Sequence, residues 1–368
     1  MKKSIAILHY THWDQLLGGA EQQLKYLSEF MRDSGIDVHV IFPNRNANVT
    51  SANGLHLHNL GENILPGTFG KSWFLFNQKI QHRLTMINPD VIITRTYSSF
   101  AGIAAHYAKL HNKKHVHFIA SDSEIDIFHQ KISILKIMDR IERYFFKKTF
   151  SAHSQLICQN QHQQKQVKEL FDIDAQLSTQ IAAEPENNSF KKPDDKIIVT
   201  WIANLKPVKR PEHYFTIAKA FADNPNISFI MIGPDHRNAY DAQLAKMKNQ
   251  SNFSYLGKLS NEKVNETLES AHILINTSDH EGFSNTFIQA WMREVLVISL
   301  NSNPDNILTN QKVGFLIHSV DQIIEKLRYL TKNRNQVYLL GKNAREYSLR
   351  NHSLQSSLPR VRESIYNG

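Results

Sequence analysis

The sequence has 368 residues, of which 41% are hydrophobic and 21% are charged, a balance typical of soluble globular proteins, and its length predicts two domains. Lysine and arginine outnumber aspartate and glutamate by 43 to 34, and the formal net charge of +9 favours an anionic partner: a phosphorylated metabolite, a nucleic acid or an anionic lipid surface. No apolar run approaches the roughly 20 residues of a membrane-spanning helix, which argues against an integral helical membrane protein.

The chain begins with two lysines and a short apolar stretch. This stretch is too brief for a secretory signal, so we interpret residues 4–10 as a first strand. Cys158 is the only cysteine, so no internal disulfide can form. Both observations favour a cytoplasmic protein.

Short apolar runs rich in β-branched residues recur along the first half and predict strands over residues 4–10, 37–42, 90–95, 115–120 and 155–159. Between the first two runs, an apolar stripe has the spacing of an amphipathic helix: Ala20, Leu24, Leu27 and Met31. Strands that alternate with helices predict a parallel sheet covered on both faces.

The alternation restarts after a polar, proline-containing stretch at 184–196, which we interpret as a linker. Further strands are predicted over residues 197–203, 227–233, 253–257, 272–278 and 295–300. The tail from about residue 320 has a helical pattern. Two doubly wound α/β domains are therefore expected, with ligands bound beyond the C-terminal ends of the strands.

Two glycines, Gly18 and Gly19, stand between the first strand and the first helix. A ligand could approach the backbone there, because neither residue has a side chain and the helix directs N–H groups toward it. A tight turn that needs glycine for its dihedral angles is the alternative, and a glycine pair alone leaves both open.

A basic loop follows the first strand of the second half, and its polar residues are Asn204, Lys206, Lys209 and Arg210. Pro211 suits the first turn of a helix, which places the last two cations just before the helix N-terminus. Cations there oppose the helix dipole unless an anion lies between them, so a pyrophosphate is the candidate ligand. A solvated charge cluster is the alternative.

The stretch DHEGFSNTFIQAW at residues 279–291 follows another predicted strand. Glu281 would accept hydrogen bonds from sugar hydroxyls while backbone N–H groups of Phe283 and Ser284 donate. Ser284 is also a plausible N-cap, and Gln289 lies on the helix that follows. A helix cap with one solvent-facing polar residue is the alternative.

These three motifs, GGAE, NLKPVK and EGFSNTFIQA, resemble glycosyltransferase family 4 in that order, and the resemblance spans nearly the whole chain. It implies a GT-B fold of two Rossmann-like domains facing across a cleft, and sugar transfer from a nucleotide donor with retention of configuration. It also implies an acceptor domain at 1–183, a linker at 184–196, a nucleotide-sugar domain at 197–345 and a helix at 346–368 that returns to the first domain.

The family's site residues are carried over onto matching positions. Lys209 matches the lysine that neutralises the donor pyrophosphate, and Glu281 matches the first acid of an E-x7-E pattern that binds the donor sugar. The resemblance therefore implies donor-binding residues at Gly18, Gly19, Asn204, Arg210, Gly282, Phe283, Ser284, Asn285 and Gln289.

Several positions depart from the family pattern. Gln289 replaces the second acid, which usually contacts the ribose, and Asn204 replaces an arginine, so Lys206 or Arg210 would have to supply its charge. Glu294 and Leu296 stand where glycine and proline are usual.

In the first domain, Ser121 stands where the family often has a histidine. The next residue, Asp122, is our candidate for orienting the acceptor hydroxyl, with a capping or turn role as the alternative. The diphosphate leaving group would be stabilised by lysine and helix N-termini, so neither a metal nor another cofactor is expected. The acids at 172–174 follow a helix end and do not form a metal site, and no nucleic-acid-binding motif is present.

Two basic segments, residues 69–83 and 131–150, mix cations with large apolar side chains. Each is either part of the core or a peripheral contact with an anionic membrane at the inner face. The leading hypothesis is a glycosyltransferase of cell-surface polysaccharide, capsule or lipopolysaccharide synthesis, with a saccharide or lipid-linked saccharide as acceptor. The alternatives are a GT-B nucleotide-sugar epimerase and a catalytically impaired nucleotide-sugar-binding protein at the membrane.

Overall fold

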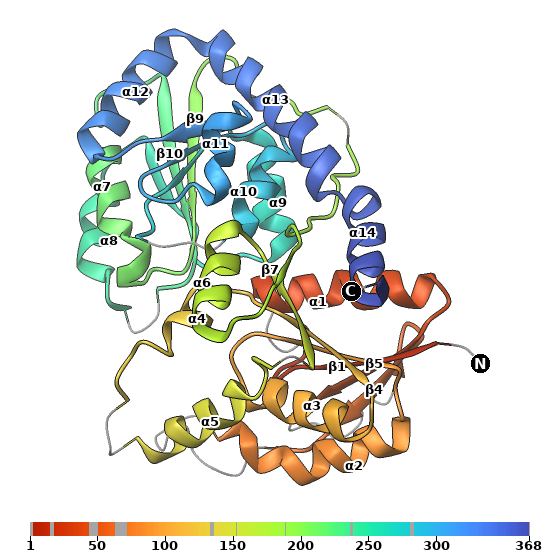
Figure 1. Ribbon diagram of the computed structural model, residues 1–368. Helices are drawn as coiled ribbons and strands as arrows, with labels where there is room; N and C mark the ends of the chain where they lie inside the picture. The colour runs from red at the N-terminus through yellow and green to blue at the C-terminus, as the bar shows by residue number, and fades with distance from the viewer. Residues whose placement is uncertain are drawn as a thin grey trace. The chain divides into compact units, whose positions relative to one another are not determined.

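The computed structural model of the protein (Figure 1) describes residues 3–14, 18–43, 51–62, 72–132, 136–151, 153–187, 189–235, 238–279 and 283–367. Two predicted site residues, Glu281 and Gly282, lie outside these ranges. The chain forms two compact units, one of Met1–Gln180 together with Ser357–Gly368 and the other of Ile181–Ser356. No helix within the described ranges is long and apolar enough to cross a membrane.

The first unit is built on one sheet. In spatial order its strands are β3 (Ser51–Ala52), β4 (Leu55–Asn59), β2 (Asp37–Phe42), β1 (Ser4–Leu8), β5 (Val91–Arg95), β6 (Lys114–Phe118), β7 (Ser154–Cys158) and β8 (Gln176–Leu177). All neighbouring strands are parallel except β3 and β4. The chain proceeds from β1 to one side and then crosses to β5 on the other. The strand order therefore reverses beside β1, which is where ligands bind in such sheets.

The helices of this unit are α1 (Gly19–Asp33), η2 (Trp73–Phe76), α2 (Asn77–Ile87), α3 (Ser99–Leu110), α4 (Ser123–Asp126), α5 (Ile137–Lys147) and α6 (Gln161–Phe171). The apolar stripe expected on the first helix is confirmed, since Leu24, Leu27 and Met31 are buried on α1. Helices α2 and α3 share a core with β1 and β5.

Helices α3 and α5 approach each other closely at a glycine. A Cβ atom at Gly102 would lie 1.7 Å from the carbonyl oxygen of Phe145, so only glycine fits this contact. Glu142 of α5 is fully buried beside it, and its carboxylate accepts hydrogen bonds from the backbone N–H of Ser99 (2.7 Å) and of Phe74 (3.2 Å). One α5 side chain therefore satisfies the first turns of both α3 and η2.

The second unit has a fully parallel sheet. Its strands in spatial order are β11 (Phe253–Tyr255), β10 (Ile227–Ile232), β9 (Ile197–Ile202), β12 (Ile273–Asn276), β13 (Leu296–Ser299) and β14 (Gly314–Leu316). Its longer helices are α7 (Pro211–Lys219), α8 (Asp241–Met247), α9 (Asn261–Ser270), α10 (Asn285–Trp291), α12 (Val320–Lys332) and α13 (Arg334–His352). The shorter ones are η3 (Pro207–Lys209), η5 (Pro304–Asn306) and α11 (Ile307–Asn310).

Separate hydrophobic cores cover the two faces of this second sheet. Helices α7, α8 and α12 contribute to one core, and α9, α10 and α13 contribute to the other (Figure 1). The strands are apolar on both faces because both faces are covered. The prediction of doubly wound α/β architecture is confirmed for both units.

The described residues of the stretch interpreted as a linker, 184–187 and 189–196, form no helix, and the second unit holds part of the stretch in place. The Lys192 ammonium donates to the Ala271 carbonyl, and Arg334 donates to the carbonyls of Asp194 and Asp195. Burial lowers the pKa of Lys192 to about 7. These contacts show that much of the stretch is packed structure rather than a loose tether.

Candidate functional site

The basic loop of the second unit follows β9, as predicted. Lys206 precedes η3, and Arg210 adopts a left-handed conformation (φ 50°) between η3 and α7. Pro211 occupies the first turn of α7, so Lys209 and Arg210 lie just before that helix. Lys209 is half-buried, whereas Asn204 is exposed.

The loop after β12 is bonded to this basic loop. The Thr277 hydroxyl donates to the Lys209 carbonyl (2.7 Å) and accepts from the Trp201 indole N–H (2.8 Å). The backbone N–H of Asp279 donates to the Val208 carbonyl (3.0 Å). The structure therefore brings two predicted donor-binding motifs together at the C-terminal edge of the sheet.

The charge of Arg210 is compensated within the unit. Its Nε lies 3.2 Å from a Glu212 carboxylate oxygen and 3.5 Å from one of Asp279. A bound anion was expected to relieve the conflict between these cations and the helix dipole. For Arg210, two carboxylates already provide that relief.

The start of α10 follows the predicted pattern in position. Ser284 is the N-cap residue, but its hydroxyl pairs with that of Thr286 (2.8 Å) rather than with a backbone N–H. Phe283 is buried, with its ring 5.2 Å from that of His352. Asn285 is the first helical residue and is half-buried. The side chain of Phe283 thus anchors the loop in the core.

Gln289, which replaces the family's second acid, faces the neighbouring helix α9. Its amide nitrogen donates to Asn261 Oδ1 (2.6 Å) and lies 3.4 Å from Asn265 Oδ1. A carboxylate at position 289 could not donate these bonds. The amide therefore has a structural role in joining α9 and α10.

In the first unit, Gly18 is the N-cap of α1 and Gly19 is the first residue of the helix. The Gly18 N–H donates to the Glu21 carboxylate (3.1 Å), and a Cβ atom at Gly18 would lie 2.6 Å from the same oxygen. The first glycine therefore gives space to Glu21, a residue that the sequence analysis did not select.

Glu21 belongs to a buried ionic cluster beyond β1, β5 and β6. Its other charged members are Arg95, at the end of β5, and Glu124, in α4. The three side chains belong to residues only 3–6% exposed. Burial lowers the pKa of Arg95 to about 10, while the charges of Glu124 and Glu21 favour its protonated form. Burial also raises the pKa of Glu21, against the influence of Arg95.

Two buried histidines adjoin the cluster. Burial lowers the pKa of His9 to about 4, so its imidazole is neutral near pH 7, with Nδ1 2.9 Å from the Thr11 carbonyl and Nε2 3.2 Å from the Thr96 hydroxyl. His117 Nε2 lies 3.5 Å from a Glu124 oxygen. Carboxylates, a guanidinium and imidazoles together can donate to and accept from several hydroxyl groups.

Asp122, the candidate for orienting an acceptor, has a partner in the structure. Its carboxylate accepts a hydrogen bond from the Gln163 amide (2.8 Å), which joins the turn before α4 to α6. Asp122 is the N-cap residue of α4 but makes no side-chain cap hydrogen bond there. Glu124, two residues later, is the acid that lies in the buried cluster.

The cluster could be found only with the fold in hand. Arg95 was visible as a charge at the end of an apolar run, but its partners come from segments far apart in the sequence. Within the described residues, no group of three or more His, Cys, Asp or Glu side chains could hold a metal ion.

Two family models match adjoining parts of the chain: Glycosyltransferase Family 4 matches residues 17–181, and Glycosyl transferases group 1 matches residues 183–347. The chain belongs to glycosyltransferase family 4. The family prediction is thereby confirmed.

Solved structures with the same fold cover nearly the whole chain. Sucrose-phosphate synthase from Thermosynechococcus elongatus has a TM-score of 0.76 at 14% identity, over 98% of each chain. WaaG, a glycosyltransferase involved in lipopolysaccharide biosynthesis, has a TM-score of 0.75 at 14% identity, over 99% of this chain and 100% of that one. Anabaena HepE, in complex with UDP and glucose, has a TM-score of 0.74 at 14% identity, over 98% of each chain. These likenesses confirm the GT-B fold.

The curated relatives match a smaller part. The trehalose synthases of Thermococcus litoralis and Pyrococcus furiosus are each 23% identical over 177 residues, which is 45% of this chain and 43% of theirs. The match thus spans less than half the length of these relatives.

Proposed function

We propose that the protein transfers a sugar, with retention of configuration, from a nucleoside diphosphate donor to a saccharide acceptor. The observation that carries this proposal is the bonding of the basic loop to the loop after β12 through Thr277 and Asp279. A nucleotide sugar needs cations at its phosphates and polar groups at its sugar ring, and we assign these two roles to the two bonded loops. The HepE structures with UDP and glucose and with UDP-glucose support this class of donor.

The leaving diphosphate gains negative charge as the glycosidic bond breaks. Lys209 and the N-terminal turn of α7 would stabilise that charge, so no metal is needed in this proposal. Glu281, which lies outside the described residues, would hold the sugar hydroxyls together with the backbone from Gly282 to Asn285. A phosphate oxygen of the leaving group would take the acceptor proton.

We place the acceptor hydroxyls at the cluster of Glu21, Arg95 and Glu124. Asp122, the candidate from the sequence, is the alternative residue for orienting the acceptor. The proposed acceptor is a saccharide carried on a lipid. The names of two structures with this fold support that choice: WaaG, involved in lipopolysaccharide biosynthesis, and WaaB, a lipopolysaccharide outer core galactosyltransferase. Synthesis of a cell-surface polysaccharide, capsule or lipopolysaccharide is the corresponding role.

The test is nucleotide release from a panel of UDP-, GDP- and ADP-sugars with a saccharide acceptor. We expect turnover with one donor, and a loss of about 100-fold or more in kcat/KM for Lys209→Ala. The matched control is Lys219→Ala, an exposed lysine at the end of α7, which should leave kcat/KM unchanged.

Other outcomes would identify the alternatives. Conversion of the donor to an epimer without acceptor would identify an epimerase. Donor binding without turnover, unchanged in Gln289→Glu, would identify a catalytically impaired binding protein. Binding to none of the donors would overturn the proposal.

A further inference from the structure

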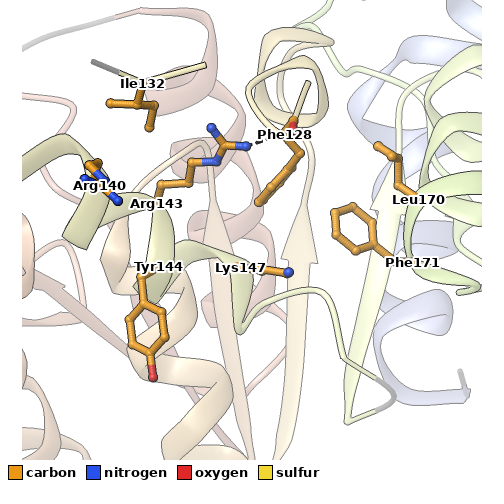
Figure 2. Close-up of a pocket in the computed structure, with 8 residues that line it drawn as sticks. All are labelled: Phe128, Ile132, Arg140, Arg143, Tyr144, Lys147, Leu170 and Phe171. Carbon is orange, nitrogen blue, oxygen red and sulfur yellow. Dashed lines mark hydrogen bonds between the residues drawn. The ribbon is translucent and has the colours of Figure 1, made fainter. Parts of the chain in front are cut away.

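A hollow of about 590 Å³ lies in the first unit between α5, the end of α6 and the segment that follows α4. Its lining residues are Phe128, Ile132, Arg140, Arg143, Tyr144, Lys147, Leu170 and Phe171. Figure 2 shows Arg143 and Lys147 extending from α5 toward Phe128 and Phe171. These described lining residues thus combine three cations with apolar and aromatic side chains, and none of them is acidic.

The charge of α5 is separated between its two sides. The acid Glu142 is fully buried, where it bonds the N–H groups of Ser99 and Phe74, and Asp139 is half-buried. The exposed residues of the helix are Ile137, Arg140, Tyr144 and Lys147, and together with the exposed N-cap residue Lys136 we call them the exposed stripe. Neither acid is among these exposed residues, so the charged members of the stripe are all cations.

The two large side chains of the exposed stripe that carry no charge are exposed to solvent rather than packed in the core. Ile137 is 60% exposed and Tyr144 is 63% exposed. The apolar pattern in residues 131–150 consists of Ile134, Ile137, Ile141 and Phe145, and core packing was one of its two interpretations. Core packing is confirmed for Phe145, which packs against the core that α2 and α3 share with β1 and β5. For Ile137 it is wrong, because this side chain lies on the side that the unit does not cover. Ile134, from the same pattern, lies outside the described residues.

We infer that the hollow and the exposed stripe of α5 bind the phosphate headgroups of anionic phospholipids at a bilayer surface. Within the described residues, Arg140 and Lys147 have no carboxylate partner, which leaves their charges for an anionic surface. Tyr144 and Ile137 suit the boundary between headgroups and acyl chains, and Phe128 and Phe171 line the hollow beneath them.

The spacing of the cations favours a surface over a single free phosphate. Lys136 and Lys147 are eleven residues apart on or beside α5, and at a rise of about 1.5 Å per residue they are separated by roughly 16 Å. One phosphate cannot contact cations that far apart, whereas a bilayer presents many. This inference concerns the first unit alone and stands apart from the proposed transfer reaction.

The experiment is co-sedimentation of the full-length protein with vesicles of phosphatidylglycerol mixed with phosphatidylcholine, compared with vesicles of phosphatidylcholine alone. We expect binding to the anionic vesicles only, weakened by added salt. Arg140→Gln and Lys147→Gln should each lower the partition coefficient about five-fold, the equivalent of about 1 kcal/mol per cation near a charged surface. Tyr144→Ala should also lower it.

Lys109→Gln, which removes an exposed charge from the last turn of α3, is the matched control and should bind like the wild type. Arg143 is unsuitable for the test because its guanidinium donates to the carbonyls of Gln130 (2.7 Å) and Phe128 (2.8 Å) and therefore supports the fold. Thermal unfolding of each variant separates loss of binding from loss of folding.

Any of four results would overturn the inference. One is equal binding to both kinds of vesicle, and another is an equal loss of binding in Lys109→Gln and Arg140→Gln. The third is release from the vesicles by inorganic phosphate at matched ionic strength, which would indicate a site for free phosphate. The fourth is binding of single-stranded RNA with the same dependence on Arg140 and Lys147. Nucleotide release in the absence of vesicles reports on transfer separately, so either proposal can fail without the other.

Discussion

Arg95 is a buried charge whose position depends on its neighbours. A guanidinium at the end of β5 is taken out of water, and the carboxylates of Glu21 and Glu124 offset part of that cost. Its Nη2 also donates to Gln180 (3.2 Å). Loss of the cation would leave two acids buried without it, and such a loss is more destabilising than the pair is stabilising.

We predict that Arg95→Leu lowers the free energy of unfolding by about 3 kcal/mol at pH 7. Burial already raises the pKa of Glu21, and removal of Arg95 removes an influence that lowers it. The folded variant then binds a proton that the unfolded chain does not bind at the same pH, so its stability recovers as the pH falls from 7 toward 5. Urea unfolding of variant and wild type at both pH values measures the difference.

The matched control is Arg328→Leu, an exposed arginine on α12, which should change stability by less than about 0.5 kcal/mol at either pH. A stability difference for Arg95→Leu that is the same at both pH values would contradict the role assigned to the carboxylates.

Individual site residues were predictable where a local rule applied. Pro211 set the start of α7 and therefore the positions of Lys209 and Arg210. Glu294 was noted only as standing where the family has glycine. The structure gives the reason, because this residue lies in the turn between α10 and β13 with φ 57°, a left-handed conformation that glycine adopts without strain. The cluster around Arg95 had no local rule, because its members meet only in the folded unit.

At the scale of elements, the contact between α3 and α5 depends on one missing side chain. A Cβ atom at Gly102 would lie 1.7 Å from the Phe145 carbonyl oxygen, and backbone cannot move aside as a flexible side chain can. This contact also sets where α5 lies, and with it the position of Glu142 beneath α3 and η2.

Gly102→Ala should therefore destabilise the protein by at least about 2 kcal/mol. Helix propensity alone predicts the opposite sign, because alanine is favoured over glycine by about 1 kcal/mol inside a helix. Chemical denaturation decides between them. Lys109→Ala, on the exposed side of the same helix, is the control and should be neutral or slightly stabilising. A more stable Gly102→Ala variant would show that the two helices can separate at little cost.

Each of the ten predicted strands has a counterpart in the structure, and their ends shift by a few residues at most. Strand β4 was missed because strands were predicted from continuous apolar runs, whereas its residues LHLHN alternate the buried Leu55 and Leu57 with polar residues, as half-buried strands do. Strand β14 was missed because a run of three residues has no periodicity to recognise. Burial on both faces gives central strands continuous apolar runs, whereas β4, second from the edge of its sheet, and β14, at the edge of the other, lack such runs.

At the scale of the whole molecule, the chain leaves its first unit after Gln180 and returns to it at Ser357. The returning residues belong to α14 (Leu354–Asn367). Within the first unit, Ile365 is fully buried, the Gln155 amide donates to the Ser364 carbonyl (2.7 Å), and the Lys3 ammonium lies 4.3 Å from the centre of the Tyr366 ring. The end of the chain therefore completes the unit in which the chain begins.

We predict that Ile365→Ala lowers the stability of the first unit by about 3 kcal/mol, because the cavity it leaves is enclosed. Amide hydrogen exchange should speed up in β1 and β7, with little change in β9 of the second unit. Leu339→Ala, which truncates an exposed side chain on α13, provides the control. Equal acceleration in both sheets would mean that the two units unfold as one.

The hydroxyl of Thr277 accepts from Trp201 and donates to the Lys209 carbonyl, so one oxygen atom connects β9, the basic loop and the segment after β12. None of these three segments can therefore be replaced alone without the loss of a Thr277 hydrogen bond. A chimaera that imports a new basic loop from another family member must import the matching stretch around residue 277 as well, and substrate preference in this fold would then be inherited as a linked block.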